Sequence, residues 1–189
     1  MRRKTFAILS LFMAITLSAQ EEARYGFKSA TVKKTIEMMG QKFEGVSYID
    51  DYGNVESAMI MNVIRTVQRG NTFTTVDMNR KVGSKEVVKE KQLNYMNITP
   101  EDIEKNEIKE LEDEEFLGKM CKKYSMKSIR MEKKVDAVTW TWKGLVLKAV
   151  YYLEDKSIMA TEYVTEIQVD VDIDPENFTI PADAKIEEE

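Results

Sequence analysis

The residues of this chain that could do chemistry are carboxylates, lysines, tyrosines and one cysteine, because the sequence contains no histidine. Histidine is the usual general base near neutral pH, and it completes Ser-His-Asp and Cys-His sites. It is also a common zinc ligand. These classes of site are therefore excluded, and we predict that the protein is not an enzyme.

Two adjacent carboxylates form the most suggestive acid–base pair. Asp50 and Asp51 directly precede Tyr52-Gly53. Aspartate and glycine are frequent in turns, because aspartate hydrogen-bonds to nearby backbone and glycine accepts a positive φ. We interpret the pair as turn residues, and we predict no catalytic residues.

An alternating acidic run near the C-terminus resembles part of a calcium-binding loop. Asp170, Asp172 and Asp174 have the spacing of EF-hand ligands, but Pro175 and Pro181 stand where that loop needs glycine and glutamate. We interpret the run as an exposed strand face and predict no metal site. None of the 8 glycines is spaced for a phosphate-binding loop, so we expect no cofactor.

Methionine and tryptophan are the candidates for contact with an apolar ligand. The chain has 12 methionines and 2 tryptophans. Methionine is flexible and polarisable, which suits a pocket for acyl chains, but it is also an ordinary core residue. Tryptophan leaves the same two alternatives. The candidate ligand-binding residues are Met59, Met61, Trp140, Trp142, Leu147 and Tyr151.

Two further features have a structural and a functional interpretation. Cys121 is the only cysteine, so it forms no internal disulfide; we expect a buried hydrophobic residue, with a reactive or dimer-forming thiol as the alternative. A basic stretch follows it, which we interpret as a solvated face or as a rim for anionic head groups or an acidic partner. The stretch consists of Lys119, Lys122, Lys123, Lys127, Arg130, Lys133 and Lys134.

The elements that position these residues are mostly strands. Period-two alternation interrupted by Gly, Asn and Asp is typical of antiparallel strands joined by hairpins. It predicts strands near 29–39, 42–50, 55–67, 71–78, 82–90, 119–130, 135–143, 145–154 and 157–169. Both faces of 58–64 and of 145–153 are apolar, so both should be covered. We therefore predict a mainly β (α+β) fold, a curled antiparallel sheet or half-barrel of about 8–9 strands.

One main helix should accompany this sheet. Thr99 can cap a helix, Pro100 suits its first position, and two acids follow at the positive end of the helix dipole. The pattern predicts a helix near 100–112 with a thin apolar stripe that includes Ile108. The acidic run 112–115 opposes the negative end of the dipole, so we expect fraying there.

The N-terminal twenty residues have the pattern of an export signal. Three basic residues precede an uncharged stretch from Phe6 to Leu17, and small residues follow at Ser18-Ala19. We predict that residues 1–20 are a signal peptide that is removed, and that 21–189 form a single β-rich domain. The apolar stretch is too short to span a bilayer and no stop-transfer segment follows, so no transmembrane segment is expected in the mature chain.

The charge of the chain limits its partners. The formal net charge is −5, and removal of Arg2, Arg3 and Lys4 with the signal makes it −8. An acidic exported chain is a poor partner for nucleic acid. The mature protein is expected in the periplasm, with secretion or association with the outer membrane as alternatives.

Four short motifs resemble the signatures of a known family, in order and spacing. They are Tyr48-Ile49-Asp50-Asp51-Tyr52-Gly53, Gly118-Lys119-Met120-Cys121-Lys122-Lys123-Tyr124, Trp140-Thr141-Trp142-Lys143-Gly144-Leu145-Val146-Leu147 and Phe178-Thr179-Ile180-Pro181. The family consists of exported Gram-negative proteins of unknown function, similar in fold to the outer-membrane lipoprotein carrier. The resemblance implies a curled sheet with helices that close an apolar cavity, and it implies no activity.

Two functions are consistent with these observations. The first is an exported, non-enzymatic binding protein with an apolar groove for a lipid or another hydrophobic ligand. The second is a cell-envelope interaction or structural module that docks a protein and has a fully packed interior. A cavity above about 300 Å³ lined by methionine and aromatic residues favours the first, and native packing density favours the second.

The predicted signal peptide can be tested on exported protein. The intact mass should correspond to a chain that begins at or just after Gln20 and carries no lipid, because no cysteine lies near that point. A mass that retains Phe6 to Leu17, or that includes an acyl group, would contradict this prediction.

Overall fold

Strand pairing organises the part of the chain that the computed structural model describes, which is residues 23–89, 92–130 and 133–188. The predicted signal peptide lies outside these residues. The first half contains β1 (Ala30–Met38), β2 (Gln41–Asp50), β3 (Val55–Ile60), β4 (Ile64–Arg69), β5 (Thr72–Asp77) and β6 (Val82–Val87). The second half contains α1 (Pro100–Asn106), β7 (Lys109–Phe116), β8 (Lys119–Arg130), β9 (Lys133–Trp142), β10 (Leu145–Tyr152), β11 (Ile158–Val169) and β12 (Lys185–Glu188).

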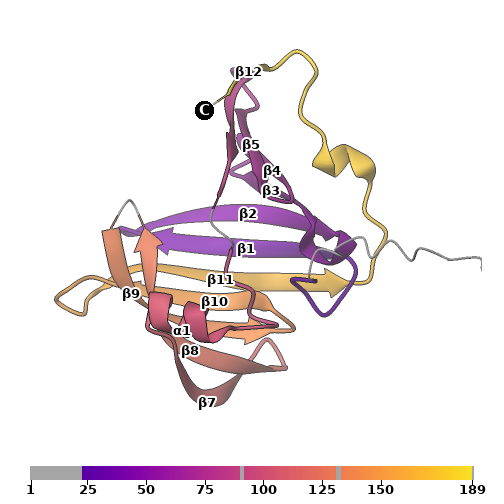
Figure 1. Cartoon of the computed structure of the whole chain (residues 1–189). Coiled ribbons are helices and arrows are strands. Elements are labelled where there is room, and N and C mark those ends of the chain that lie inside the picture. The colour runs from indigo at the N-terminus through magenta and orange to yellow at the C-terminus, as the bar shows by residue number, and fades with distance from the viewer. Residues whose placement is uncertain (1–22, 90–91, 131–132, 189) are drawn as a thin grey trace, which may run out of the picture.

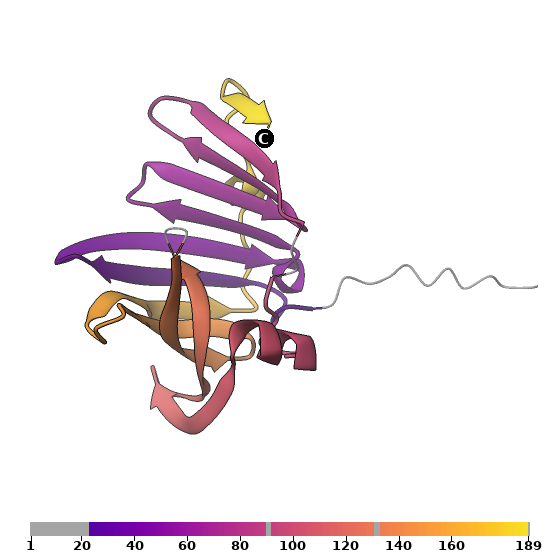
Figure 2. The ribbon, with the colours of Figure 1, turned by 60° about the vertical axis from the view of Figure 1, so that its left-hand side comes forward.

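These strands form one 12-stranded sheet in the order β12-β6-β5-β4-β3-β2-β1-β11-β10-β9-β8-β7. Two antiparallel meanders, β1 to β6 and β7 to β11, meet where β1 pairs with β11. The C-terminal strand β12 pairs with β6 in the parallel direction. Figure 1 shows this order, and Figure 2 shows how steeply β8 and β9 run across the central strands. The predicted mainly β fold, with one helix and an open curled sheet, is confirmed.

The predicted number of 8–9 strands is wrong, and so is the single strand over 55–67. The structure divides that range into β3 and β4 around a turn at 61–63. Met61 and Asn62 both have positive φ, 55° and 56°, which is unusual for methionine. Apolar alternation continues through this turn, so the sequence pattern does not reveal it. Met61 is 58% exposed, so the prediction that both faces of 58–64 are covered is wrong at this residue.

The predicted helix over 100–112 is also too long. It begins as expected, with a capping box between Thr99 and Asp102, but it ends at Asn106, and Glu107 takes a left-handed conformation. Ile108 is buried, and the acidic residues that follow form strand β7 instead of a frayed helix end. Lysines of β8 offset the acidic charge: Lys122 pairs with Glu110 and Lys123 with Glu114.

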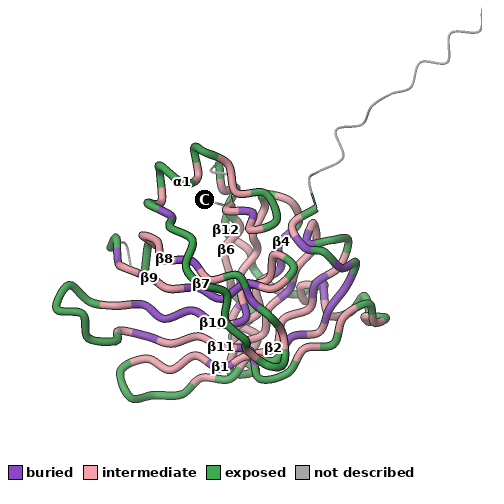
Figure 3. Tube along the Cα trace, turned by 90° about the horizontal axis from the view of Figure 1, so that it is seen from below, coloured by how far each residue is buried: buried purple, intermediate pink, exposed green. Residues whose placement is uncertain are grey.

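The buried residues lie mainly along the central strands of the sheet. Figure 3 shows buried residues along β1, β10 and β11, whereas α1 and β7 are mostly exposed. Ile49, Leu147, Val76 and Cys121 are the largest fully buried side chains of the described residues. Cys121 is thus a buried thiol, as expected, and burial raises its pKa.

The C-terminal segment runs back along the first meander before it reaches β6 (Figure 1). A 3-10 turn, Pro175–Phe178, lies against β3, and Phe178 is buried. Two arginines of β4 hold this turn by its backbone. The Arg65 guanidinium donates to the Thr179 carbonyl at 3.0 Å, and the Arg69 guanidinium donates to the Phe178 carbonyl at 3.2 Å.

Phe178→Ala should lower the free energy of unfolding by about 3–5 kcal/mol, because it removes a buried ring and leaves a cavity. Chemical denaturation measures this change. Ile158→Ala is the control, since Ile158 is 63% exposed and should change stability by less than about 0.5 kcal/mol. Equal midpoints for the two variants would contradict the role of Phe178 as the anchor of the segment.

Candidate functional site

A small cavity of about 190 Å³ lies on one face of the central strands. We call this the inner face, and it is defined by the alternate residues Val32 and Lys34 of β1, Ile49 of β2, and Glu162 and Val164 of β11. Residues of β10 form the remaining side of the cavity. The apolar lining of the cavity consists of Val32, Ile49, Leu93, Leu145, Val146, Leu147 and Val164.

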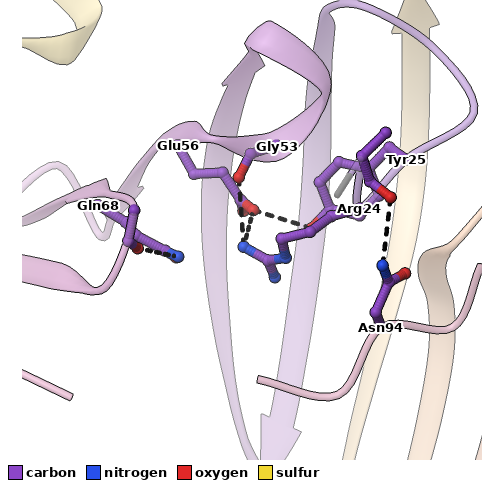
Figure 4. Close-up of polar contacts among 8 residues, drawn as sticks. Arg24, Tyr25, Gly53, Glu56, Gln68 and Asn94 are labelled. Atoms are coloured by element: carbon purple, nitrogen blue, oxygen red, sulfur yellow. Dashed lines mark hydrogen bonds and ion pairs between the residues drawn. The ribbon is translucent and has the colours of Figure 1, made fainter. Parts of the chain in front are cut away.

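Two segments outside the sheet close the cavity. One is the N-terminal stretch with Arg24 and Tyr25, and the other is residues 92–98, which we call the covering segment. The Asn94 side chain donates to the Ala23 carbonyl at 3.2 Å and so ties the two together (Figure 4). The Tyr95 hydroxyl contacts Met126 Sδ at 3.3 Å. At Gly144 (φ +83°), a Cβ would lie 2.3 Å from the Arg24 carbonyl oxygen, so only glycine permits this close approach.

A half-buried carboxylate, that of Glu56, lies at one end of the cavity. The Arg24 guanidinium and the Tyr25 hydroxyl both donate to Glu56 Oε1, at 2.6 and 3.1 Å (Figure 4). Burial raises the pKa of Glu56 in spite of the Arg24 charge, and it also raises the pKa of Tyr25. The Glu56 carboxylate is therefore partly desolvated and is fixed in position by two hydrogen-bond donors.

A second charged cluster borders the same cavity. Lys34 Nζ lies 3.0 Å from Glu162 Oε1, and the Arg130 guanidinium lies 3.5 Å from Glu162 Oε2. Arg130 also stacks over the Tyr151 ring at 4.2 Å and donates to its hydroxyl. Burial acts to raise the pKa of Glu162, but Lys34 and Arg130 outweigh it and hold the pKa below its usual range.

The cavity is smaller than a typical ligand site. Sites for small molecules occupy about 300–1,000 Å³, which is more than this cavity offers. Among the described residues, no cluster of three or more metal-ligating side chains could hold a metal ion. Asp50 and Asp51 are used in a turn, where Asp50 Oδ1 accepts from the Asp51 amide at 2.8 Å.

The structure does not bring the six candidate ligand-binding residues into one site. Leu147 lines the cavity, and Tyr151 lies on the inner face beside Arg130. Met59 and Met61 line a different feature, an open surface hollow of about 860 Å³ around β1 to β3. This hollow also includes Phe43 and Tyr48, together with Lys33, Lys42 and Glu44.

Trp140 points away from the cavity. Glu162 lines the cavity and pairs with Ala149, which in turn pairs with Thr139. Neighbouring residues in a strand face opposite sides, so Trp140 lies on the other face, which we call the outer face. Met59 shares the outer face by the same reasoning, but β3 and β9 are five strands apart, roughly 24 Å.

Lysines cover both tryptophans. Lys123 and Lys148 lie 4.7 and 4.5 Å from the centre of the Trp140 ring, one on each side. Trp140 also belongs to the hydrophobic core cluster and is only 6% exposed. Trp142 has Lys119 at 4.2 Å and Lys143 at 5.0 Å, and it stacks on Phe27.

Sequence reasoning missed the charged residues of the cavity. Glu162 stands at an inward position of β11 between two apolar inward residues, Ala160 and Val164, which is a signal that alternation alone could have given. Lys34 follows Val32 in β1 in the same way. The contact between Arg24 and Glu56 could not be predicted from alternation, because the two residues come together only through tertiary packing.

The comparisons with known proteins show the fold. No protein-family model matches the chain, and no curated protein matches it. An uncharacterised conserved protein from Thermus thermophilus has a TM-score of 0.60 at 10% identity, over 86% of this chain and 91% of that one. MucB has a TM-score of 0.59 at 10% identity, over 87% of this chain and 61% of that one. This chain thus spans about three fifths of MucB.

The matching structures also include proteins with lower TM-scores. They include a putative outer membrane lipoprotein-sorting protein domain from Vibrio parahaemolyticus, at 10% identity over 83% of this chain and 92% of that one, with a TM-score of 0.42. Among the described residues, no helix is long and apolar enough to cross a bilayer.

The two environments of the candidate residues predict different effects of mutation. Trp140→Ala should lower the free energy of unfolding by about 3–5 kcal/mol, because a buried ring is lost. Met61→Gln is the comparison, and it should change stability by less than about 0.5 kcal/mol because Met61 is exposed. Denaturant midpoints measure both changes. A small effect of Trp140→Ala would mean that the ring lines an open groove.

Proposed function

We propose that the protein is a non-enzymatic module of the cell envelope that binds another protein. The observation that carries this proposal is the small size of the inner-face cavity, about 190 Å³, between the covering segment, the N-terminal stretch and the sheet. A curled sheet that carried a lipid inside would need a larger space. The inner face is instead used for packing, so the outside of the sheet is the surface that remains for recognition.

The polar contacts of the cavity also oppose a carrier function. To open the cavity, Tyr25 and Arg24 would have to leave Glu56, whose carboxylate they satisfy at 3.1 and 2.6 Å. The Arg24 and Glu56 side chains are only 24% and 20% exposed, and a partly desolvated charge that loses its partners destabilises the fold. The closure is thus part of the stable fold, and an entering ligand would have to compensate for its loss.

The comparison with MucB supports a protein partner. MucB shares the fold of this chain, and it has been solved in complex with MucA from Pseudomonas aeruginosa. A protein that contains this fold thus binds a second protein, which supports the same class of function for this chain. The match to MucB has low identity and covers only part of MucB, so it does not identify the partner of this chain. The proposal therefore names only the class of partner, a protein.

The proposed location is the periplasm, with secretion or association with the outer membrane as alternatives. The pattern of residues 1–20 supports export. The absence of histidine in the sequence and the turn role of Asp50 and Asp51 support a function without catalysis.

The open hollow at Met59 and Met61 favours a second candidate function, the binding of a hydrophobic ligand. Phe43 and Tyr48 join the methionines there, which gives the hollow an apolar part. Binding sites for small ligands bury most of the ligand surface, however, and this hollow is open and bordered by Lys33 and Lys42. A protein partner fits such a surface better than a lipid does.

Photo-crosslinking in the native host tests the preferred function. A photoreactive residue at each of the exposed positions Met39, Val87, Leu117 and Ile129 samples separate turns and strands. We expect a discrete protein adduct at one or two of these positions and none at the others, because docking uses one surface. Adducts at all four positions, or at none, would contradict a specific protein partner.

Mass spectrometry of the same purified protein tests the alternative. We expect no lipid in stoichiometric amount in the extracted material, because the inner cavity is too small for it. A stoichiometric lipid that is lost in Met59→Gln would overturn the proposal and establish ligand binding in the hollow.

A further inference from the structure

The outer face of β8 to β10 carries an unusual group of cations and aromatic rings. We define the lysine–tryptophan patch by Lys119, Lys123, Lys143, Lys148, Trp140 and Trp142. Lys123 and Lys148 come from the strands on either side of Trp140, with which both pair in register. Lys119 begins β8, and Lys143 stands in the turn after β9.

The patch carries more positive than negative charge. Glu114 pairs with Lys123 at 2.6 Å and also interacts with Lys148, and Asp113 and Lys119 both lie near Cys121. Lys119, Lys143 and Lys148 form no ion pair with any carboxylate of the described residues. The four lysines of the patch therefore outnumber the acidic residues beside them, on a chain whose formal charge is −5.

The rings hold these cations in fixed positions. Each ammonium group lies 4.2–5.0 Å from the centre of an indole ring, within the range of a cation–π contact. A free lysine on a surface loses considerable side-chain entropy when it binds a partner. Lysines that already lie on rings lose less, so the patch is preorganised for an anionic partner.

We propose that the lysine–tryptophan patch docks an acidic segment of the protein partner, whose carboxylates lie over Lys119, Lys143 and Lys148. This inference rests on the proposed function and names the surface and the partner chemistry. The complementarity is one of charge: Lys143 is exposed and Lys119 and Lys148 are half-buried, and none of the three forms an ion pair with a described carboxylate, so the partner would supply the carboxylates. The apolar rings of Trp142 and Phe116 beside the lysines would contact the apolar residues of the same segment.

The fixed geometry favours a protein segment over a membrane. Anionic head groups are mobile and attract lysines wherever these lie, so a membrane gains little from ammonium groups in set positions. A folded or extended protein segment has carboxylates at set positions and gains from such an arrangement. Trp140 is also buried beneath the lysines, and so it offers no ring for insertion between lipids.

The test uses the full mature chain and a labelled peptide in which glutamate alternates with threonine. Lys119→Gln, Lys143→Gln and Lys148→Gln are combined in one variant, since none of the three has an ion pair to lose. We expect the variant to bind the peptide about tenfold more weakly than wild type at low salt. A peptide with glutamine in place of glutamate should not bind to either protein.

A matched variant controls for net charge. Lys28→Gln, Lys89→Gln and Lys133→Gln remove the same charge from exposed positions outside the patch. We expect this variant to bind as wild type does. Equal weakening in both variants would show attraction by net charge alone and would overturn the proposal.

Vesicles of phosphatidylglycerol and phosphatidylcholine provide the membrane arm. We expect no co-sedimentation of the wild-type protein with them at physiological salt. Co-sedimentation that disappears in the patch variant would overturn the proposal in favour of a lipid surface.

The native-host adducts separate this proposal from the proposed function. Leu117 stands two residues before Lys119, so an adduct there that disappears in the patch variant supports docking at the patch. An adduct only at Val87 or Met39 would reject the patch while a protein partner stands. No adduct anywhere would reject the protein partner itself.

Discussion

The pairing of β1 with β11 is the contact on which the rest of the structure depends. It joins the two meanders, and its partners, from Ala30 with Val169 to Met38 with Ala160, are more than 120 residues apart. The irregularity between Lys33 and Lys34 sets which β1 residues face Glu162 and Val164, and so it fixes the walls of the inner cavity. Because the pairing is so distant in sequence, its loop-closure entropy must be offset by the packing it creates.

Local signals in the sequence predicted the elements whose causes are local. The breaks predicted between strands 29–39 and 42–50 and between 135–143 and 145–154 occur as turns at Gly40 and at Lys143-Gly144, and the predicted cap at Thr99 is also present. Turn and cap chemistry depends on neighbouring residues, so such signals are local. The Met61-Asn62 turn was missed because the alternation passes through it. Strand β7 was missed because its acidic charge is offset by lysines of another strand. The ion pairs of the candidate site depend on the β1–β11 register, which no local pattern specifies.

Charged residues are accommodated differently on the two faces of the sheet. On the inner face, charged residues such as Glu56 and Glu162 are tolerated because two donors or two cations satisfy each of them. On the outer face, lysine ammonium groups lie over the two tryptophan rings at cation–π distance. The first arrangement fixes the interior, and the second leaves charge available at the surface. This division favours recognition from outside over transport within.

The parallel strand β12 at the far edge of the sheet limits the self-association of the protein. An unpaired strand edge is a template for pairing with another chain, and β6, with Val82 and Val87 exposed, would be such an edge. The last four residues of the described chain cover it, and lysine–carboxylate pairs at Lys81–Asp183 and Lys85–Glu188 hold them there. Strand β12 thus protects the edge of β6 from pairing with another chain. Removal of β12 by a protease would leave a folded protein that self-associates.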